Sequence, residues 1–255
     1  MSTPNNNITL VTGSSRGLGR DMALQLADQG HKLIVTYHSN KEAAEEVAAE
    51  VERRGQKAIT AQIDTRDTES FPKFFEQLAP KLKSAFGTDK IDFLVNNAGT
   101  TYHGMVADTT EKAFDDLYHI HFKGVYFLTQ AALPHLNDGG GIVNVSTGLT
   151  RFAIPGYSAY ASMKGAIEVY TQYLAKELGG RGIRANAVAP GAIDTDFNAA
   201  AFEHNPGMKE QLASVTSLGR VGKASDIGGV VAFLCSPAGA WVNAQRLEAS
   251  GGMFL

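Results

Sequence analysis

The alternation of short apolar runs with longer amphipathic stretches is the feature that most constrains the fold of this chain. Short runs rich in Val, Ile and Leu between polar turns are typical of buried strands. Ala43, Val47 and Val51 recur at steps of four, the spacing of a helix face that packs on a sheet. Strand and helix alternate, which predicts an α/β fold with a doubly wound parallel sheet. The predicted strands are 8–11, 32–35, 58–59, 91–95, 141–145 and 183–188, and the predicted helices are 19–29, 41–54, 70–86, 111–136 and 159–178.

The composition favours one self-sufficient domain. The chain has 255 residues, of which 44% are hydrophobic and 19% charged, so it can bury a large core without metals or disulfides. No linker, charge block or repeat divides it. We therefore expect a single domain over residues 1–255, with no metal site.

Charge and targeting signals narrow the class of partner. The formal net charge of -3 provides no broad basic surface, which argues against nucleic acid and favours a small-molecule ligand. The single cysteine, Cys235, has no partner for a disulfide, as is usual in a reducing compartment. Residues 1–7 lack the features of a signal peptide, and no apolar run approaches the ~18 residues of a membrane span. We expect a cytoplasmic protein with no membrane contact.

A glycine-rich turn follows the first predicted strand. Residues 12–19 read Thr-Gly-Ser-Ser-Arg-Gly-Leu-Gly and lead into a helix. Gly13 and Gly17 can adopt backbone angles closed to other residues and admit a pyrophosphate, and Gly19 lets helix and strand approach. Three glycines could also form only a tight turn, but their place between the first strand and first helix favours phosphate binding in a Rossmann-type sheet.

The end of the second predicted strand bears on the choice of cofactor. Dinucleotide folds that bind NAD usually place a carboxylate there to hold the ribose 2′-hydroxyl. Residues 37–41 are instead Tyr-His-Ser-Asn-Lys. Arg16, Ser39 or Lys41 could bind a 2′-phosphate, so NADP(H) is favoured over NAD(H), which is not excluded. Arg16 and Lys41 could instead be surface side chains that contact only water. His38 is interpreted as a surface residue near this position.

A tyrosine and a lysine one helical turn apart are the candidate reacting groups. Tyr160 and Lys164 share a helix face, and a nearby ammonium is expected to lower the tyrosine pKa from ~10 toward neutrality. Spacing alone is weak support for a site. Ser146 strengthens it, because this serine ends the predicted strand 141–145 and is placed to hydrogen-bond a substrate oxygen.

In these motifs the chain resembles the short-chain dehydrogenase/reductase superfamily, and in particular its 3-oxoacyl-carrier-protein reductase-like members. The resemblance runs from residue 8 to about 252. It is carried by the glycine turn, residues 96–99 (Asn-Asn-Ala-Gly), Ser146, Tyr160 with Lys164, and Pro190-Gly191 followed by Ile193 and Thr195. It implies that Tyr160 is the general acid/base, that Ser146 polarises the carbonyl, and that Lys164 holds the nicotinamide ribose.

The resemblance also implies a set of cofactor-binding residues. Asp64 would contact adenine, residues 96–99 would support the central strand and the adenosine ribose, and Ile193 with Thr195 would meet the carboxamide. Asp64 could instead cap a loop, and Asn97 and Gly99 could only shape a turn. The full expected set is Gly13, Ser15, Arg16, Gly17, Leu18, Gly19, Tyr37, His38, Ser39, Asp64, Asn97, Ala98, Gly99, Tyr160, Lys164, Pro190, Gly191, Ile193 and Thr195.

Two parts of the chain depart from the family pattern. Members usually carry an asparagine three residues before a glycine on the long middle helix, where it supports a proton relay, and here His121 precedes Gly124. An imidazole with an ordinary pKa of ~6.5 could pass protons, so we hypothesise that His121 substitutes for the asparagine. A packed, uninvolved histidine is the alternative. Near the end, Asn243-Ala244 replaces the usual Thr-Gly pair and Ser250 replaces the usual aspartate before Gly-Gly, and both changes bear on subunit contacts.

The substrate end suggests a neutral carbonyl compound. Leu149, Phe152 and Tyr157 could wall a pocket, and residues 192–217, with Phe197, Phe202, Pro206 and Gly207, could form a lid. These stretches contain no basic cluster that would suit an anionic substrate. A ketone, a β-oxo thioester and a sugar-like molecule all remain candidate substrates.

The main functional hypothesis is an NADP(H)-dependent carbonyl reductase or alcohol dehydrogenase. A non-catalytic dinucleotide sensor is the alternative because of His121, and a dehydratase or epimerase is a third. By resemblance we expect a homo-oligomer, either a dimer or a homotetramer.

Overall fold

A parallel sheet forms the centre of the computed structural model, which describes residues 6–196, 199, 202–203, 205 and 207–255. In the described part of the chain its strands run in the order β3-β2-β1-β4-β5-β6-β9, and each neighbouring pair is parallel. The order reverses between β1 and β4, the switch point at which ligands bind in doubly wound sheets. The prediction of a Rossmann-type α/β fold is confirmed. The strands are β1 Ile8–Val11, β2 Lys32–Tyr37, β3 Ala58–Gln62, β4 Ile91–Asn96, β5 Leu136–Val145, β6 Arg184–Pro190 and β9 Arg246–Ala249.

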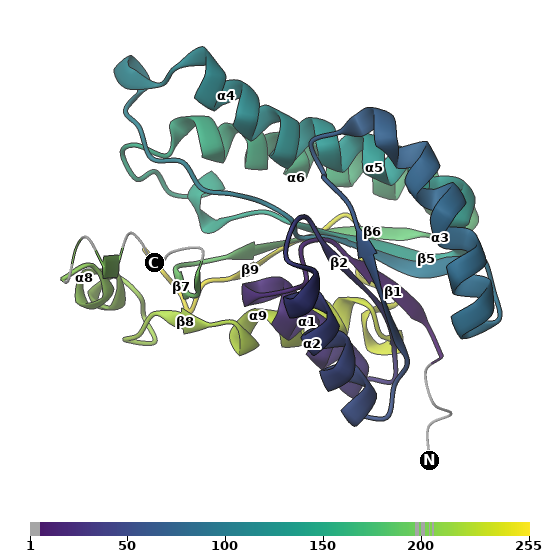
Figure 1. Ribbon diagram of the computed structural model, residues 1–255. Coiled ribbons are helices and arrows are strands. Elements are labelled where there is room, and N and C mark those ends of the chain that lie inside the picture. Colours follow the sequence, from purple (N-terminus) through teal and green to yellow (C-terminus); the bar gives the residue numbers. More distant parts are fainter. Residues whose placement is uncertain (1–5, 197–198, 200–201, 204, 206) are drawn as a thin grey trace.

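Helices cover both faces of the sheet (Figure 1). On one side lie α1 (Gly17–Asp28), α2 (Lys41–Arg53) and α9 (Ser225–Leu234), and on the other lie α3 (Phe71–Phe86), α5 (Gly124–Ala132) and α6 (Ser158–Leu178). The short strands β7 (Ile193–Asp194) and β8 (Gly222–Lys223) pair beside α8 (Met208–Ser214), beyond the carboxyl ends of the main strands. No described helix has the length and apolarity that crossing a bilayer requires.

Alternation along the strands divides the core into two layers. Leu10 and Val11 are both fully buried, but they belong to separate apolar clusters, because successive strand residues point to opposite faces. Val11 packs in the cluster that includes Leu24 and Val231, and Leu10 in the one that includes Leu78 and Leu174. Both faces are therefore closed to water, as expected for a parallel sheet.

The predicted helix 111–136 is interrupted. It begins as α4 (Glu111–Tyr118), widens into a π turn over His119–Lys123, continues as α5 and ends in a 3-10 turn at Leu133–His135. Such π turns often occur at functional sites. Gly124 follows the π turn at a point where a Cβ atom would collide with the main-chain oxygen of Thr65. The close approach of α5 to the Thr65 loop thus depends on glycine.

Gly124→Ala should lower the free energy of unfolding by about 1–3 kcal/mol, because the new methyl group meets rigid backbone. Gly229→Ala is the matched control: Gly229 is also helical, nothing lies within 4 Å of its added Cβ, and alanine there should stabilise α9 by roughly 0.5–1 kcal/mol. Chemical denaturation of both variants measures the difference. Equal stabilisation by both substitutions would contradict the close approach.

Candidate active site

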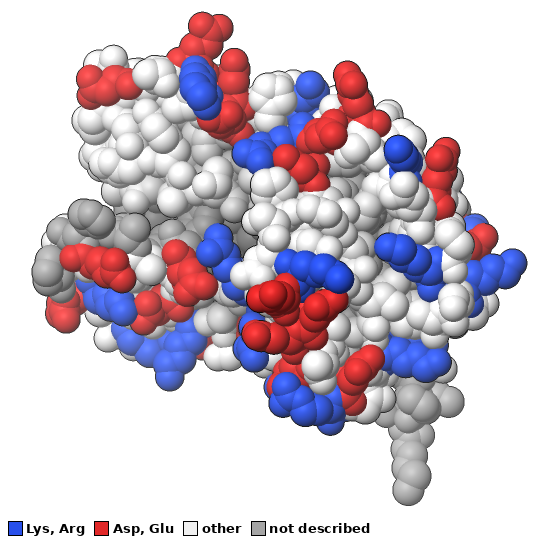
Figure 2. Space-filling view, viewed as in Figure 1, with Lys and Arg blue, Asp and Glu red and all other residues white. Residues whose placement is uncertain are grey.

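One cavity of about 970 Å³ collects the predicted site residues at the carboxyl ends of the strands. It opens as a hollow between the surface over α4 and the surface over α8, on a face where acidic and basic side chains are interspersed (Figure 2). All of the expected catalytic and cofactor-binding residues line it, from Gly13 near β1 to Thr195 beyond β6. Lys41 does not line it and is paired with Glu45 at 3.2 Å.

The glycine turn after β1 is shaped to admit an anion. Gly13 and Gly17 have φ values of +62° and +54°, which favour glycine. A Cβ on Gly19 would lie 2.6 Å from Asn97 Nδ2 and would also collide with the Gly13 carbonyl oxygen. Helix α1 has neither a side-chain cap nor an acidic residue in its first turn, whereas Asn40 caps α2. The first N–H groups of α1 are thus left for an anion such as a pyrophosphate.

Side chains from two neighbouring strands hold this turn in place. The Thr12 hydroxyl accepts hydrogen bonds from Asn97 N and Ala98 N, both at 2.9 Å. The Asn97 amide donates to the carbonyls of Thr12 and Gly13, and Gly13 N donates to the Thr36 hydroxyl at 3.1 Å. Asn97 therefore fixes the backbone of the turn through these hydrogen bonds. Sequence reasoning assigned no role to the Thr12 or Thr36 side chain, since spacing does not show which hydroxyl groups reach the turn.

The adenosine end combines exposed polar groups with one carboxylate. Tyr37 is buried at the end of β2, and His38 and Ser39 are exposed at the rim. Asp64 accepts two hydrogen bonds from the Arg66 guanidinium and lies 3.3 Å from His38. Burial of Asp64 acts to raise its pKa, but hydrogen bonds from Arg66 outweigh this effect and lower it. Arg66 is a cation of the cavity wall that the sequence analysis did not single out.

Tyr160 and Lys164 lie buried on one face of α6, as predicted. Lys164 Nζ donates to the Val145 carbonyl oxygen at 2.7 Å and lies 5.7 Å from the centre of the Tyr160 ring. Burial lowers the pKa of Lys164 to about 7. It raises the pKa of Tyr160, against the smaller opposing effect of a hydrogen bond with the Thr147 side chain. The expectation that Lys164 brings the Tyr160 pKa toward neutrality is wrong for the protein alone, because desolvation of the phenolate dominates.

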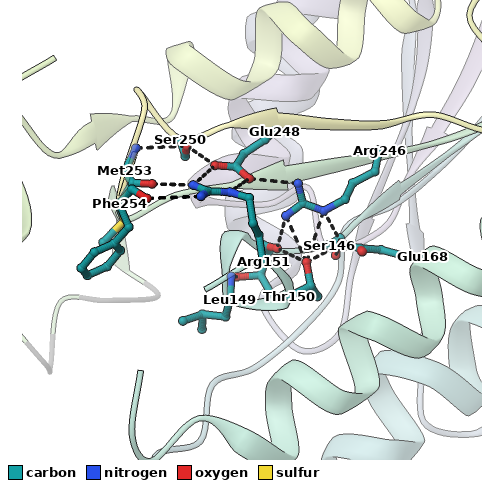
Figure 3. A network of polar contacts seen from close by, with 11 residues as sticks. Ser146, Leu149, Thr150, Arg151, Glu168, Arg246, Glu248, Ser250, Met253 and Phe254 are labelled. Carbon is teal, nitrogen blue, oxygen red and sulfur yellow. Dashed lines mark hydrogen bonds and ion pairs between the residues drawn. The ribbon is translucent and has the colours of Figure 1, made fainter. Parts of the chain in front are cut away.

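The hydroxyl group beside Tyr160 belongs to Thr147 and not to Ser146. Ser146 lines the cavity, but its Oγ donates to Glu168 Oε1 at 2.6 Å (Figure 3). Thr147 follows in extended backbone, so its side chain points to the other side, toward the phenol. Arg246 donates to the Thr147 carbonyl at 3.1 Å and fixes this position from behind. The hydrogen-bonding role predicted for Ser146 is therefore available to Thr147.

His121 is buried against Tyr160. Its ring meets the phenol ring edge-on, with 5.1 Å between centroids. Nε2 lies 2.7 Å from the Thr100 carbonyl oxygen and also 3.3 Å from the Thr100 N–H group. The shorter contact favours a proton on Nε2, and Nδ1 is buried with no hydrogen-bond partner in the described chain. Burial first, and then the Lys164 charge, hold the His121 pKa well below its usual range. The assumption of an ordinary pKa is wrong, and the proton-relay role stays a prediction.

The His121 ring should stay neutral from about pH 5 to about pH 8, the interval in which an ordinary histidine gains its charge. The ¹³C and ¹⁵N NMR shifts of the imidazole, assigned with a His121→Asn variant, should show a protonated Nε2 and no titration in this interval. A titration midpoint near the usual histidine value would contradict the buried, neutral ring.

The substrate end of the cavity is mainly apolar. Leu149, Phe152 and Tyr157 line it as predicted, and so do Met253 and Phe254, which the sequence analysis missed. The predicted lid 192–217 contributes the half-exposed Met208 and the buried Phe202. Phe197 and Pro206 lie outside the described residues, and Gly207 directly precedes α8. Among the described residues no group of three or more His, Cys, Asp or Glu side chains could hold a metal ion.

Comparison with known proteins identifies the family. A family model described as enoyl-(acyl carrier protein) reductase matches residues 13–254. A short-chain type dehydrogenase/reductase of Picea abies is 36% identical over 96% of this chain and 91% of its own length. The 3-oxoacyl-[acyl-carrier-protein] reductase of Staphylococcus aureus is 35% identical over 96% of this chain and 97% of its own. The chain belongs to the short-chain dehydrogenase/reductase family of oxidoreductases.

Solved structures agree with this assignment. The promiscuous reductase LugOII, which catalyses keto-reduction at C1 in lugdunomycin biosynthesis, has a TM-score of 0.93 and 38% identity, with both chains fully covered. The angucycline C-6 ketoreductase LanV with bound NADP has a TM-score of 0.92 and 37% identity, covering 97% of this chain and 95% of its own.

Proposed function

We propose that the protein is an NADP(H)-dependent reductase that converts a neutral ketone to a secondary alcohol. The observation that carries the proposal is that one cavity joins the glycine turn after β1 to Thr147, Tyr160 and Lys164. LugOII and LanV are both ketoreductases, which supports the same reaction here.

The proton chemistry follows from the burial of Tyr160. When bound, the reduced nicotinamide supplies a hydride to the carbonyl carbon. Tyr160 Oη donates its proton to the carbonyl oxygen, and the Thr147 hydroxyl hydrogen-bonds the same oxygen. Because burial raises the Tyr160 pKa, the phenol keeps its proton at neutral pH until the oxygen gains charge. This ordering favours reduction over alcohol oxidation, which needs phenolate.

NADP(H) fits the adenosine end better than NAD(H). No carboxylate ends β2, where one would repel a 2′-phosphate, and Asp64 is already held by Arg66 and His38. Arg16 lies exposed at the cavity rim and can bind a phosphate through charge-assisted hydrogen bonds. The NADP bound to LanV supports this choice. Asp64 is proposed to face adenine, and Ile193 with Thr195 the carboxamide.

A dinucleotide sensor without catalysis is the alternative function. The buried, neutral His121 at the usual asparagine position is the feature that favours it. A sensor should bind NADPH yet reduce no ketone.

Tyr160→Phe should lower kcat for ketone reduction by roughly 10²- to 10⁴-fold, the usual contribution of a general acid, while NADPH still binds. Tyr173→Phe, on the exposed side of the same helix, should leave kcat unchanged. NADPH oxidation with a panel of ketones measures both. Turnover that survives in Tyr160→Phe would overturn the mechanism, and NADPH binding without turnover in the unaltered protein would favour the sensor.

The two neighbouring hydroxyl groups should differ sharply in effect. Thr147→Val should cost roughly 10²- to 10³-fold in kcat, as expected for loss of one preorganised donor, and Thr147→Ser should restore most of it. Ser146→Ala should change kcat only a few-fold, since Glu168 keeps its bonds from Thr150 and Arg246. Steady-state kinetics would refute this assignment if Ser146→Ala proved the more damaging variant.

Arg16→Gln should raise KM for NADPH roughly ten- to hundredfold and leave KM for NADH nearly unchanged, because it removes a charged partner of the 2′-phosphate. Arg20→Gln, one turn further along α1 and outside the cavity, is the control. Equal effects of Arg16→Gln on both cofactors would count against the proposed 2′-phosphate contact.

The outer face of α5 and α6 supports assembly into a homodimer or homotetramer. Tyr126 and Phe127 on α5 are each 39% exposed, and Val169 and Tyr173 on α6 are 54% and 63% exposed. Apolar side chains gathered on one exposed face are typical of a subunit contact.

Cys235 is buried and unpaired, as suits the reducing cytoplasm.

A further inference from the structure

Residues 250–255 fold back over the segment that carries Thr147. Phe254 N donates to the Val215 carbonyl at 2.8 Å, and Met253 forms an antiparallel bridge with Thr216. Leu218 N donates to the Gly251 carbonyl at 3.1 Å. The segment is thereby held against the stretch that follows α8, with Met253 almost fully buried and Phe254 at the cavity wall.

Arg151 also holds this segment, through its guanidinium group (Figure 3). Its guanidinium makes a two-pronged ion pair with Glu248, with Nε and Nη2 each 2.7 Å from a carboxylate oxygen. The same group donates to the carbonyl oxygens of Met253, at 2.5 Å, and of Phe254, at 3.3 Å. A planar guanidinium suits this arrangement of fixed acceptors. Hydrogen bonding from Arg151 is the main reason that the pKa of Glu248 falls to about 2, so the pair stays ionised.

The clamp continues to the helix that carries Tyr160. Arg246 pairs with Glu248 at 3.0 Å and with Glu168 of α6 at 2.7 Å. Two arginines and two glutamates thus alternate from the segment 250–255 to α6. Ser250, at the position where the family usually has aspartate, donates to Glu248 at 2.5 Å. An aspartate there would face Glu248 with like charge, so the serine is compatible with this network.

The held segment presents an aromatic wall. The centroids of the Phe254 and Phe152 rings are 4.8 Å apart, and both residues line the apolar end of the cavity. Phe254 has a φ of +54°, which is uncommon for a bulky residue and persists only where surrounding contacts impose it. Arg151 lies over the other ring, 5.1 Å from the centre of Phe152. One arginine therefore fixes both aromatic rings.

We propose that Met253 and Phe254, held by Arg151, form a specificity-determining wall that selects flat aryl ketones over small aliphatic ones. Paired aromatic rings offer a flat ligand stacking and edge contacts that an aliphatic ring cannot match. Arg151 is a positioning residue, since it acts on the ligand only through this wall. The inference rests on the proposed function, because it takes this cavity to be the ketone-binding site. It concerns which ketones bind there and not how fast they are reduced.

The test measures binding of two ketones, tetralone and cyclohexanone, by isothermal titration calorimetry in the presence of NADP⁺, where no reduction can occur. Phe254→Ala and Arg151→Gln should each weaken tetralone binding roughly five- to twentyfold and change cyclohexanone binding less than about twofold. Arg181→Gln is the matched control. Arg181 also pairs with a carboxylate, Asp138, and donates to two carbonyl groups, and its side chain is 35% exposed like that of Arg151, but it lies outside the cavity.

The expected pattern is a changed binding ratio in both wall variants and an unchanged ratio in Arg181→Gln. An unchanged ratio in Phe254→Ala, or an equal loss for both ketones, would overturn the proposal, and Phe254→Ala decides the question if Arg151→Gln fails to fold. A changed ratio would uphold the wall even if the protein reduced neither ketone, because NADPH oxidation with the ketone panel tests the proposed reductase separately.

Discussion

The hydrogen bond from Lys164 to the Val145 carbonyl is the contact on which the site depends. It ties the helix that carries Tyr160 to the end of β5, and it is made by an amine that is almost fully buried. Burying an ammonium costs free energy, which appears as the lowering of the Lys164 pKa to about 7. The same burial raises the pKa of Tyr160 and lowers that of His121. All three groups are thus driven toward their neutral forms in the protein alone.

This neutrality suits the site to the carbonyl reduction that we propose. A protonated phenol is ready to donate to a carbonyl oxygen, and the Thr147 hydroxyl lies beside it. The polar groups that surround the site are hydrogen-bonded to one another. Asn97 and Thr12 hold the glycine turn, Glu168 accepts a hydrogen bond from Ser146, and Arg246 donates to the Thr147 carbonyl. The groups that would take part in the proposed reaction therefore lie on backbone that is held in place, and Phe152 and Phe254 line the apolar end of the cavity.

The sequence predicted the sheet and the cavity better than the details within them. The first six strands have apolar runs and were found, but β9 has only four half-buried residues, and α9 begins with Ser-Asp-Ile-Gly-Gly, which weakens any helix signal. The π turn at 119–123 was invisible because it keeps the helical pattern. Ser146 was chosen over Thr147 because spacing cannot tell which neighbour in an extended segment faces the phenol. The Arg151 contacts with Glu248 and residues 253–254 join positions about a hundred residues apart, which no local pattern reports.

The most direct test of this account is the pKa of Lys164 itself. In the cofactor-free protein, ¹⁵N-detected NMR of the lysine side chains, with the signal assigned through a Lys164→Met variant, should show the Lys164 ammonium losing its proton near pH 7. A Lys164 signal that titrates near the ordinary lysine value of about 10.4 would show that burial does not govern the site, and the account of a neutral, proton-holding Tyr160 would fail with it.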